Sequence, residues 1–384
     1  MDTCCATEKC ILNSINRNTT LSKPLRIFVD MHVFDGTLQG TTTYLKGLYT
    51  ELIKDQSIQF FLAARKVDRL KLIFGEHSNV TYLQYPRQNK FSRLFFTIPQ
   101  LIQKNQIDYA HFQYVVPPIK KCAYINTIHD VLFLDFPRYF PISYRLKNYL
   151  LFKFSAQLSE VVLTVSEFSK RQLQHHFGLP AVGLTPNAVD PVFFEPYDKI
   201  NTQQAVLQKY GAANYWLYVS RWEPRKNHDF LLKAFVEGGF YADHHLVFVG
   251  DPALPNQAYD KYFARLSPQI QQKIIPLTKV DFQDLLLLVR GATLSVYPSV
   301  AEGFGIPPLE SIAASVPTLC SNTTAMADFD FIGSNLFHPL RVEEFIEKAK
   351  TALTHPFDTT QKEHVAQRYS WALAAQNFKQ ALQK

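Results

Sequence analysis

Two stretches of the chain share one order of elements, and this repetition limits the folds that the sequence can adopt. In the first, the apolar run Arg26–Met31 is followed by a glycine-containing segment, Gly36–Tyr44, and by apolar residues at helical spacing up to Ile53. In the second, the run Tyr215–Ser220 leads through a cationic loop to a helix over about residues 228–236. A strand, a turn and a helix in this order are typical of parallel α/β sheets.

Further apolar runs of strand length alternate with helical or loop segments in both halves. They are residues 59–63, 109–112, 123–128, 161–165, 246–250, 293–297 and 317–320. The segment Thr185–Pro196 contains three prolines and is interpreted as the connection between two domains, with the boundary near Glu195. The sequence therefore predicts a polar, flexible tail over residues 1–22, a Rossmann-like domain over 23–195 and a second one over 196–365. Two such domains facing each other enclose a cleft at the carboxyl ends of their strands.

Length and composition agree with two folded domains. The 384 residues are about twice the usual domain size, and 47% hydrophobic with 19% charged residues excludes wholesale disorder. No apolar run approaches the ~20 residues that span a bilayer, and the N-terminus lacks the order of a signal peptide. We therefore expect a cytoplasmic location. The cysteines predict no disulfide framework, and no zinc-finger spacing follows Cys4, Cys5 and Cys10.

The net charge of +7 lies in the first half of the chain. Residues 1–195 hold 22 Lys and Arg against 15 Asp and Glu, which leaves 18 against 18 in the remainder. A basic half can attract nucleic acid, an anionic membrane or an anionic substrate, and the chain has no nucleic-acid-binding motif. The stretches 86–96 and 138–154 interleave cations with aromatic residues. They predict either a peripheral contact with the inner face of a membrane, which we favour, or an ordinary amphipathic helix that covers the sheet.

Two loops of the second half carry residues suited to a nucleoside diphosphate and a sugar. The loop Ser220–Asn227 has three cations, and fixed cations stabilise the charge that a diphosphate gains as it departs. Arg221 and Lys226 fit this role, although a solvated charged loop would look similar. The second loop follows the strand 293–297 and leads into a helix that we expect to begin at Pro307 or Pro308. Its glycines allow backbone amides to approach a ligand closely.

From Tyr215 to Thr318 the sequence resembles the nucleotide-binding domain of family 4 retaining glycosyltransferases, which have the GT-B architecture. The family hallmark E-G-F-G-x-P-x-x-E is matched by Glu302, Gly303, Phe304, Gly305, Pro307 and Glu310, and its phosphate-binding pair by Arg221 and Lys226. The resemblance implies that Glu310 accepts hydrogen bonds from ribose hydroxyls and that Glu302 lies beside the donor sugar. The amides of Phe304 and Gly305 would contact the sugar hydroxyls. Glu302 as a covalent nucleophile stays open beside front-face displacement.

The resemblance continues weakly into the rest of the chain. Gly36–Tyr44 is similar to the family's N-terminal glycine loop, which implies that Gly40 and Thr41 contact a phosphate or the acceptor. His129, followed by Asp130, is similar to the His-Asp pair of mannosyltransferase-like members and would bind the donor sugar or the reacting centre. Residues 366–384 resemble the terminal helix that packs back on the first domain. The chain departs from the family where Asn187-Ala188 and Ala314-Ser315 each lack a common glycine, which predicts altered turns.

The sequence thus predicts transfer of a hexose from a nucleoside-diphosphate sugar to a glycan or lipid-linked acceptor, with GDP-mannose the favoured donor. No cofactor, catalytic metal or nucleic-acid partner is expected. The Asp328-Phe-Asp330 segment has a metal-binding form, but it follows the donor motif and is interpreted as a surface turn. Two alternatives stay open: a sugar-nucleotide epimerase of the same architecture and a non-catalytic sugar-nucleotide-binding partner of another enzyme.

Overall fold

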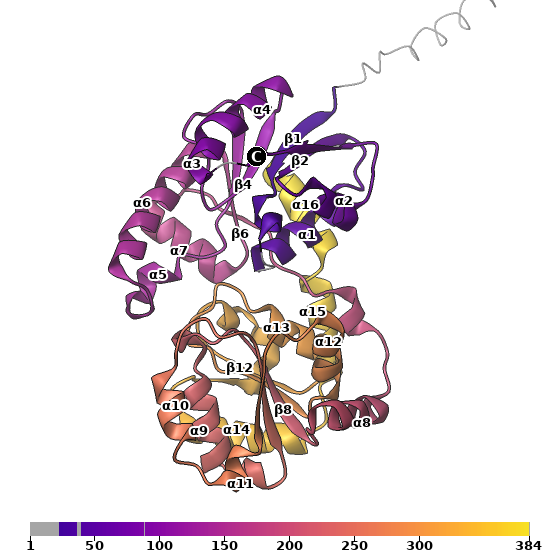
Figure 1. The fold of residues 1–384 in the computed structure, drawn as a ribbon, viewed down its shortest axis with the longest axis vertical. Coiled ribbons are helices and arrows are strands. Elements are labelled where there is room, and N and C mark those ends of the chain that lie inside the picture. Colours follow the sequence, from indigo (N-terminus) through magenta and orange to yellow (C-terminus); the bar gives the residue numbers. More distant parts are fainter. Residues whose placement is uncertain (1–22, 37–39, 88, 384) are drawn as a thin grey trace, which may run out of the picture.

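The computed structural model describes residues 23–36, 40–87 and 89–383, so the predicted tail 1–22 lies outside the described residues. Two separate parallel sheets, each covered by helices, lie one above the other along the long axis (Figure 1). Their strand orders are β3-β2-β1-β4-β5-β6-β7 and β10-β9-β8-β11-β12-β13. This confirms the predicted α/β class with two Rossmann-like domains. We call the part built on the first sheet the first domain and the part built on the second sheet the second domain.

The first sheet has its core around β1. Its strands are β1 (Leu25–Asp30), β2 (Ile58–Ala64), β3 (Val80–Gln84), β4 (Tyr109–Gln113), β5 (Ala123–Thr127), β6 (Val161–Thr164) and β7 (Gly183–Leu184). Helices α1 (Gly40–Leu52), α2 (Val67–Phe74), α3 (Lys90–Ser92), α4 (Ile98–Lys104), α5 (Leu132–Asp135), α6 (Ile142–Leu158) and α7 (Glu167–Phe177) cover it. In β1, Ile27, Phe28 and Val29 are fully buried, because strands pair on both sides and helices cover both faces.

The second sheet repeats the plan with six strands. These are β8 (Tyr215–Val219), β9 (His245–Val249), β10 (Ile274–Leu277), β11 (Leu294–Tyr297), β12 (Thr318–Ser321) and β13 (Leu336–Phe337). The helices are α8 (Lys199–Tyr210), α9 (His228–Glu237), α10 (Gln257–Phe263), α11 (Pro268–Gln271), α12 (Phe282–Gly291), α13 (Ile306–Ala313), α14 (Val342–Thr354) and α15 (Thr359–Arg368). A last helix, α16 (Trp371–Ala381), leaves this domain. The sequence did not indicate β3, β7, β10 or β13, which are the edge strands of the two sheets.

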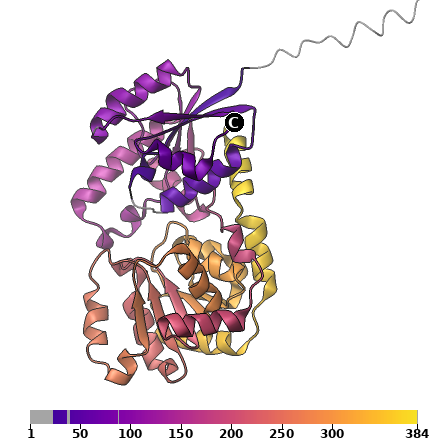
Figure 2. The same ribbon diagram turned by 45° about the vertical axis from the view of Figure 1, so that its right-hand side comes forward.

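Helix α16 ends the chain on the first domain, although α15 before it packs on the second (Figures 1 and 2). Its first residue, Trp371, lies against α1 so closely that a Cβ atom on Gly47 would be 2.0 Å from the indole ring. Near the other end of α16, the Lys379 Nζ is 3.1 Å from an Asp55 carboxylate oxygen. The terminal helix therefore ties the second domain to the first through a fitted helix contact.

Two helix starts differ from the sequence prediction. Helix α1 begins at Gly40, so the residues expected to form a loop up to Tyr44 are already helical and present an N-terminus at the cleft. Helix α13 begins at Ile306, after Gly305 with a φ of 110°. After α13, Ser315 has a φ of 58°, so a residue with a side chain occupies the left-handed conformation that glycine favours.

Candidate functional site

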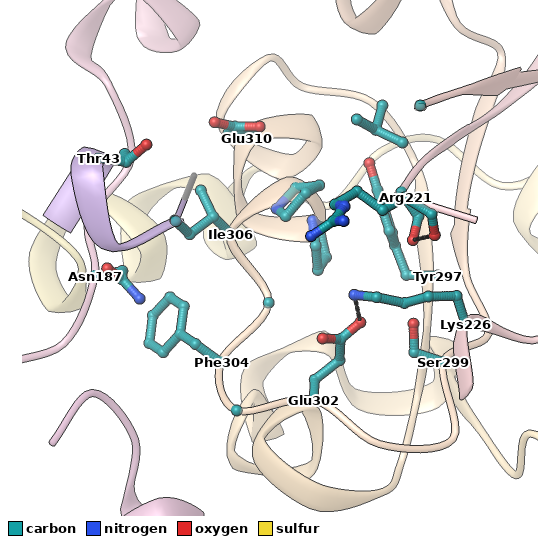
Figure 3. A pocket seen from close by; sticks show the side chains of 18 of the residues that line it. Thr43, Asn187, Arg221, Lys226, Tyr297, Ser299, Glu302, Phe304, Ile306 and Glu310 are labelled. Atoms are coloured by element: carbon teal, nitrogen blue, oxygen red, sulfur yellow. Dashed lines mark hydrogen bonds and ion pairs between the residues drawn. The ribbon is translucent and has the colours of Figure 1, made fainter. Parts of the chain in front are cut away.

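The candidate site is a cleft of about 850 Å³ between the two sheets. Loops at the carboxyl ends of the strands form its walls, as expected for two facing α/β domains. All the predicted site residues line it: Gly40, Thr41, His129, Arg221, Lys226, Glu302, Gly303, Phe304, Gly305 and Glu310. Figure 3 shows several of these side chains pointing into one space. The fold thus brings together residues that lie up to 270 positions apart in the sequence.

Glu302 is held by two cations from the loop after β8. The Lys226 Nζ donates to one carboxylate oxygen, and the Arg225 guanidinium lies 3.1 Å from the other (Figure 3 draws the first of these). Burial alone would raise the pKa of Glu302, but the charges of Lys226 and Arg225 outweigh it and lower the pKa to about 2. Glu302 is therefore an ionised carboxylate in a site where little of it, 14%, is exposed.

Arg225 is a site residue for which the sequence indicated no separate role. It also binds Glu223 at 2.9 Å and the carbonyl oxygen of Ala301 at 2.7 Å. The signal was present, because Arg225 belongs to the same cationic loop, but only the structure shows that it points inward. Arg221 is instead 62% exposed, 3.8 Å from Glu223, and reaches into the open cleft (Figure 3). Arg221 is thus the cation of this loop that is most accessible to a ligand.

Glu310 contrasts with Glu302 because no described residue makes a hydrogen bond or an ion pair with its carboxylate. It lies on α13 and faces the cleft (Figure 3). Burial, together with the negative charge of Asp190, raises its pKa to about 7. A carboxylate without a protein partner at the wall of a cleft is suited to accept hydrogen bonds from ligand hydroxyls.

His129 follows β5, and the side chains of Gln113 and Tyr44 hold its ring in place. Its Nε2 lies 2.8 Å from Gln113 Oε1, and its ring packs edge-on against Tyr44 at a centroid distance of 5.0 Å. Burial lowers the pKa of His129 to about 4, so the ring is neutral at neutral pH. Its Nδ1 has no hydrogen-bond partner among the described residues. His129 can therefore exchange hydrogen bonds with a ligand, and the neutral ring is a poor source of protons.

Asp130 lies where the two domains touch. One of its oxygens accepts the backbone N–H of Leu132 at 3.2 Å, a contact within its own loop. The carboxyl also packs on Gly303 of the second domain, where an added Cβ would lie 2.7 Å from it. Burial raises the pKa of Asp130, while Arg225 acts in the opposite direction. Gly303 therefore has a second reason to be glycine, namely the close approach of the opposite domain.

The start of α7 holds the donor loop from the first domain. The hydroxyls of Ser166 and Ser169 donate to the carbonyl oxygen of Gly303 at 2.8 and 3.2 Å. Nearby, Asp328 accepts the backbone N–H of Phe168 at 2.9 Å and a guanidinium N–H of Arg171 at 3.2 Å. The interpretation of Asp328 as part of a surface turn is therefore wrong, because its side chain bridges the two domains.

The described residues contain no group of three or more His, Cys, Asp or Glu side chains that could hold a metal ion. The second carboxylate of the Asp-x-Asp segment, Asp330, pairs with Arg368 at 3.0 Å. Both carboxylates of this segment are thus occupied by protein partners. Independence from a metal stays a prediction.

Family models match most of the chain in two parts. One described as "Glycosyltransferase Family 4" covers residues 38–193, and one described as "Glycosyl transferases group 1" covers residues 199–369. The two matches meet in the linker that joins the two sheets.

Several curated proteins are similar in sequence. O-antigen chain mannosyltransferase B of Escherichia coli is 29% identical over 229 residues, which cover 53% of this chain and 54% of that protein. O-antigen chain mannosyltransferase RfbU of Salmonella typhimurium is 30% identical over 199 residues, which cover 51% of each. The chain therefore spans about half the length of these relatives.

Solved structures share the fold over nearly the whole chain. Sucrose-phosphate synthase from Thermosynechococcus elongatus has a TM-score of 0.73 at 16% identity and covers 94% of this chain and 98% of its own. The Anabaena protein HepE, solved in complex with UDP-glucose, has a TM-score of 0.69 at 16% identity and covers 94% and 99%. At this identity the likeness concerns the fold alone.

Proposed function

Because the chain belongs to the family 4 glycosyltransferases of GT-B architecture, we propose that it transfers a hexose from a nucleoside-diphosphate sugar to a glycan or lipid-linked acceptor with retention. One observation carries the proposal. The cleft between the domains combines a carboxylate clamped by two cations, Glu302, with a carboxylate that has no protein partner, Glu310. The first suits a site where charge develops, and the second suits recognition of a vicinal diol.

The proposed roles follow from the contacts of each side chain. Glu310 accepts hydrogen bonds from the ribose hydroxyls, and Arg221 binds the diphosphate from the open side of the cleft. As the bond between the sugar and the diphosphate breaks, negative charge grows on the departing phosphate, and the fixed cations Arg225 and Lys226 stabilise it. The neutral His129 binds a sugar hydroxyl.

We favour front-face displacement for the transfer step. The acceptor oxygen forms its bond to the anomeric carbon on the side from which the diphosphate departs, and the departing phosphate oxygen takes the acceptor proton. This route leaves Glu302 ionised throughout, which agrees with the low pKa that Lys226 and Arg225 impose on it. No cofactor or metal enters the step.

GDP-mannose is the proposed donor. The support is that the two relatives described above are named mannosyltransferases, and that a third, from Corynebacterium glutamicum and 26% identical over 176 residues, is named as GDP-mannose-dependent. The names belong to those proteins, so the donor base and sugar need their own experiment.

We further propose a peripheral position at the inner face of an anionic membrane. Along α6, the side chains of Ile142, Leu146, Leu150 and Phe154 are 50 to 74% exposed at intervals of four residues. The helix has three cations and no acidic residue. An exposed apolar row beside cations that form no ion pair with a described residue suits a lipid surface better than water. Among the described residues, no helix is long and apolar enough to cross a membrane.

The first experiment is a thermal-shift panel of GDP, UDP, ADP and their sugars on the native chain and on Glu310→Ala. A ligand that binds the folded state raises the Tm by mass action. We expect a shift with GDP and GDP-mannose that is lost in the variant. If no nucleotide shifts the native chain, the proposed donor site is wrong. Activity that persists in EDTA would support metal independence.

Acceptor dependence separates the transferase from its alternatives. A transferase releases free nucleoside diphosphate in step with acceptor, whereas an epimerase changes the sugar without releasing the nucleotide. If the chain binds the sugar nucleotide but neither releases nucleoside diphosphate nor changes the sugar with any acceptor of a broad panel, the non-catalytic alternative is favoured. Arg225 and Lys226 both pair with Glu302 in the cleft, and these charged groups favour a catalytic role over binding alone.

A further inference from the structure

Asn187 carries a buried amide that the protein itself does not satisfy. The residue lies in the linker between the domains and is 5% exposed. Its Oδ1 is enclosed and has no hydrogen-bond partner, and no described residue hydrogen-bonds to its Nδ2. Buried amides are almost always bonded. The Oδ1 atoms of Asn79 and Asn126 also lack a partner, but their Nδ2 atoms donate to backbone carbonyl oxygens, so Asn187 differs from both in having neither atom bonded to a described residue.

The amide belongs to the cleft. Asn187 lines it together with Thr43 and Phe304, and Figure 3 draws these three on one side of the space, across from Arg221. Oδ1 is enclosed, but Nδ2 is not among the enclosed atoms without a partner, so it is the atom open to a ligand. An amide N–H₂ donates two hydrogen bonds, and oxygen atoms of a ligand would accept them.

A second feature of the same wall favours an anion. Helix α1 runs over 13 residues and begins at Gly40, and Gly40, Thr41 and Thr43 all line the cleft. The backbone N–H groups of Gly40 and Thr41, at the start of the helix, have no intrahelical acceptor, and the helix dipole adds partial positive charge there. Asn187 and the start of α1 therefore offer donors to one ligand group, and a phosphate presents several acceptor oxygens to them.

We propose that Asn187 is a binding residue whose amide donates a hydrogen bond to a phosphate oxygen held at the start of α1. The inference rests on the proposed function, because a nucleoside-diphosphate sugar supplies such oxygens. The phosphate has two possible sources: the diphosphate of the donor or a phosphate group of the acceptor. The Nδ2 atom, which no described residue bonds, is the donor of this hydrogen bond, and the enclosed Oδ1 takes no part in it.

The proposal has a signature that a structural role cannot produce. Replacing an unbonded buried amide with an apolar side chain of similar size removes an unsatisfied group and costs the folded state nothing. We expect Asn187→Leu to keep or raise the Tm without ligand and to weaken phosphate binding about 10-fold or more, the effect of losing a hydrogen bond to a charged group. Asn187→Asp should weaken it further, because a carboxylate repels the phosphate.

Asn79 supplies a matched control. This asparagine is also buried, at 4% exposure, but its Nδ2 donates to the carbonyl oxygens of Ile53, Asp55 and Ile58 at 2.9 to 3.1 Å, away from the cleft. Asn79→Leu should therefore lower the Tm and leave nucleotide binding unchanged. If Asn187→Leu does not fold, Asn187→Ala gives the same comparison with less bulk.

Calorimetric titration of the full chain with GDP, and with inorganic phosphate at saturating GDP, decides the source. Weaker GDP binding in Asn187→Leu assigns the amide to the donor diphosphate. Unchanged GDP binding with weaker phosphate binding assigns it to an acceptor phosphate. If the variant binds both as the native chain does, the inference is overturned. If the native chain binds no nucleotide, the proposed function fails first, so the two failures are distinguishable.

Discussion

At the scale of single residues, the two glutamates of the donor motif have opposite electrostatic environments. Glu302 is clamped by Lys226 and Arg225, so its pKa falls to about 2, whereas Glu310 lies near Asp190 without a cation, so its pKa rises to about 7. Both glutamates belong to the same motif, so the motif alone does not predict this difference in pKa. The partners supplied by other loops decide their charge.

Replacing the clamped carboxylate should impair transfer. In Glu302→Gln the two cations lose their counter-charge beside the sugar, and we expect kcat to fall by about 10²-fold or more, as for other fixed charges at a reacting centre. Glu223→Gln is the control, because Glu223 also pairs with Arg225. Steady-state kinetics with the identified donor measures both. Equal losses in both variants would mean that the balance of charge, and not the position of Glu302, matters.

Glu302 also predicts a pH dependence of stability. A carboxyl whose pKa is lowered in the folded state stabilises the fold above its unfolded pKa, near 4.5, and loses that contribution as the pH falls toward about 2. The Tm difference between the native chain and Glu302→Gln should therefore shrink between pH 5 and pH 3. A constant difference over this range would contradict the ion-pair assignment.

Glu310 should show the opposite trend. Its folded pKa is raised to about 7, so the folded state binds more protons than the unfolded state between pH 4.5 and pH 7, and the free energy of unfolding falls as the pH rises through this window. Glu310→Gln removes the ionisation, so its Tm relative to the native chain should increase from pH 5 to pH 7.5. Thermal unfolding in matched buffers tests this, and a flat difference would overturn it.

At the scale of elements, the contact between α1 and α16 depends on a glycine. Alanine normally stabilises a helix by ~1 kcal/mol relative to glycine. A Cβ on Gly47 would, however, lie 2.0 Å from the Trp371 ring, so we expect Gly47→Ala to lower the Tm. The double variant Gly47→Ala with Trp371→Ala should be more stable than the sum of the two single changes predicts, because the ring is then absent. Additive effects would exclude a direct clash.

At the scale of the whole molecule, the domains are held together by contacts that lie beside the cleft. Asp328 binds the start of α7 through Phe168 and Arg171. In Asp328→Ala we expect a more open pair of domains, seen as a larger radius of gyration in solution scattering, and a KM for the donor about 10-fold higher, from the loss of charge-assisted hydrogen bonds. Asp330→Ala is the control, because Asp330 pairs with Arg368, the last residue of α15 in the second domain. A radius equal to that of the native chain would contradict the bridging role.

The class of fold and the two donor loops could be predicted from the order of residues along the chain. Apolar runs such as Tyr215–Ser220 predict buried strands, and the residues from Glu302 to Glu310 lie close together in the chain, so their relation is local. Periodicity and motif spacing report such local relations directly. An edge strand such as β7 was not predicted, because its two residues are too few to show a periodic pattern.

The contacts between side chains of loops that are far apart in the sequence became known only from the folded structure. In the folded chain Arg225 pairs with Glu302, Asp328 lies between the domains, and the Asn187 amide at the cleft has no partner among the described residues. Hydrogen bonds and ion pairs act over a few ångströms, and no pattern along the chain tells which loops approach to that distance. The charge state of a carboxylate in the cleft is for this reason a property of the folded molecule.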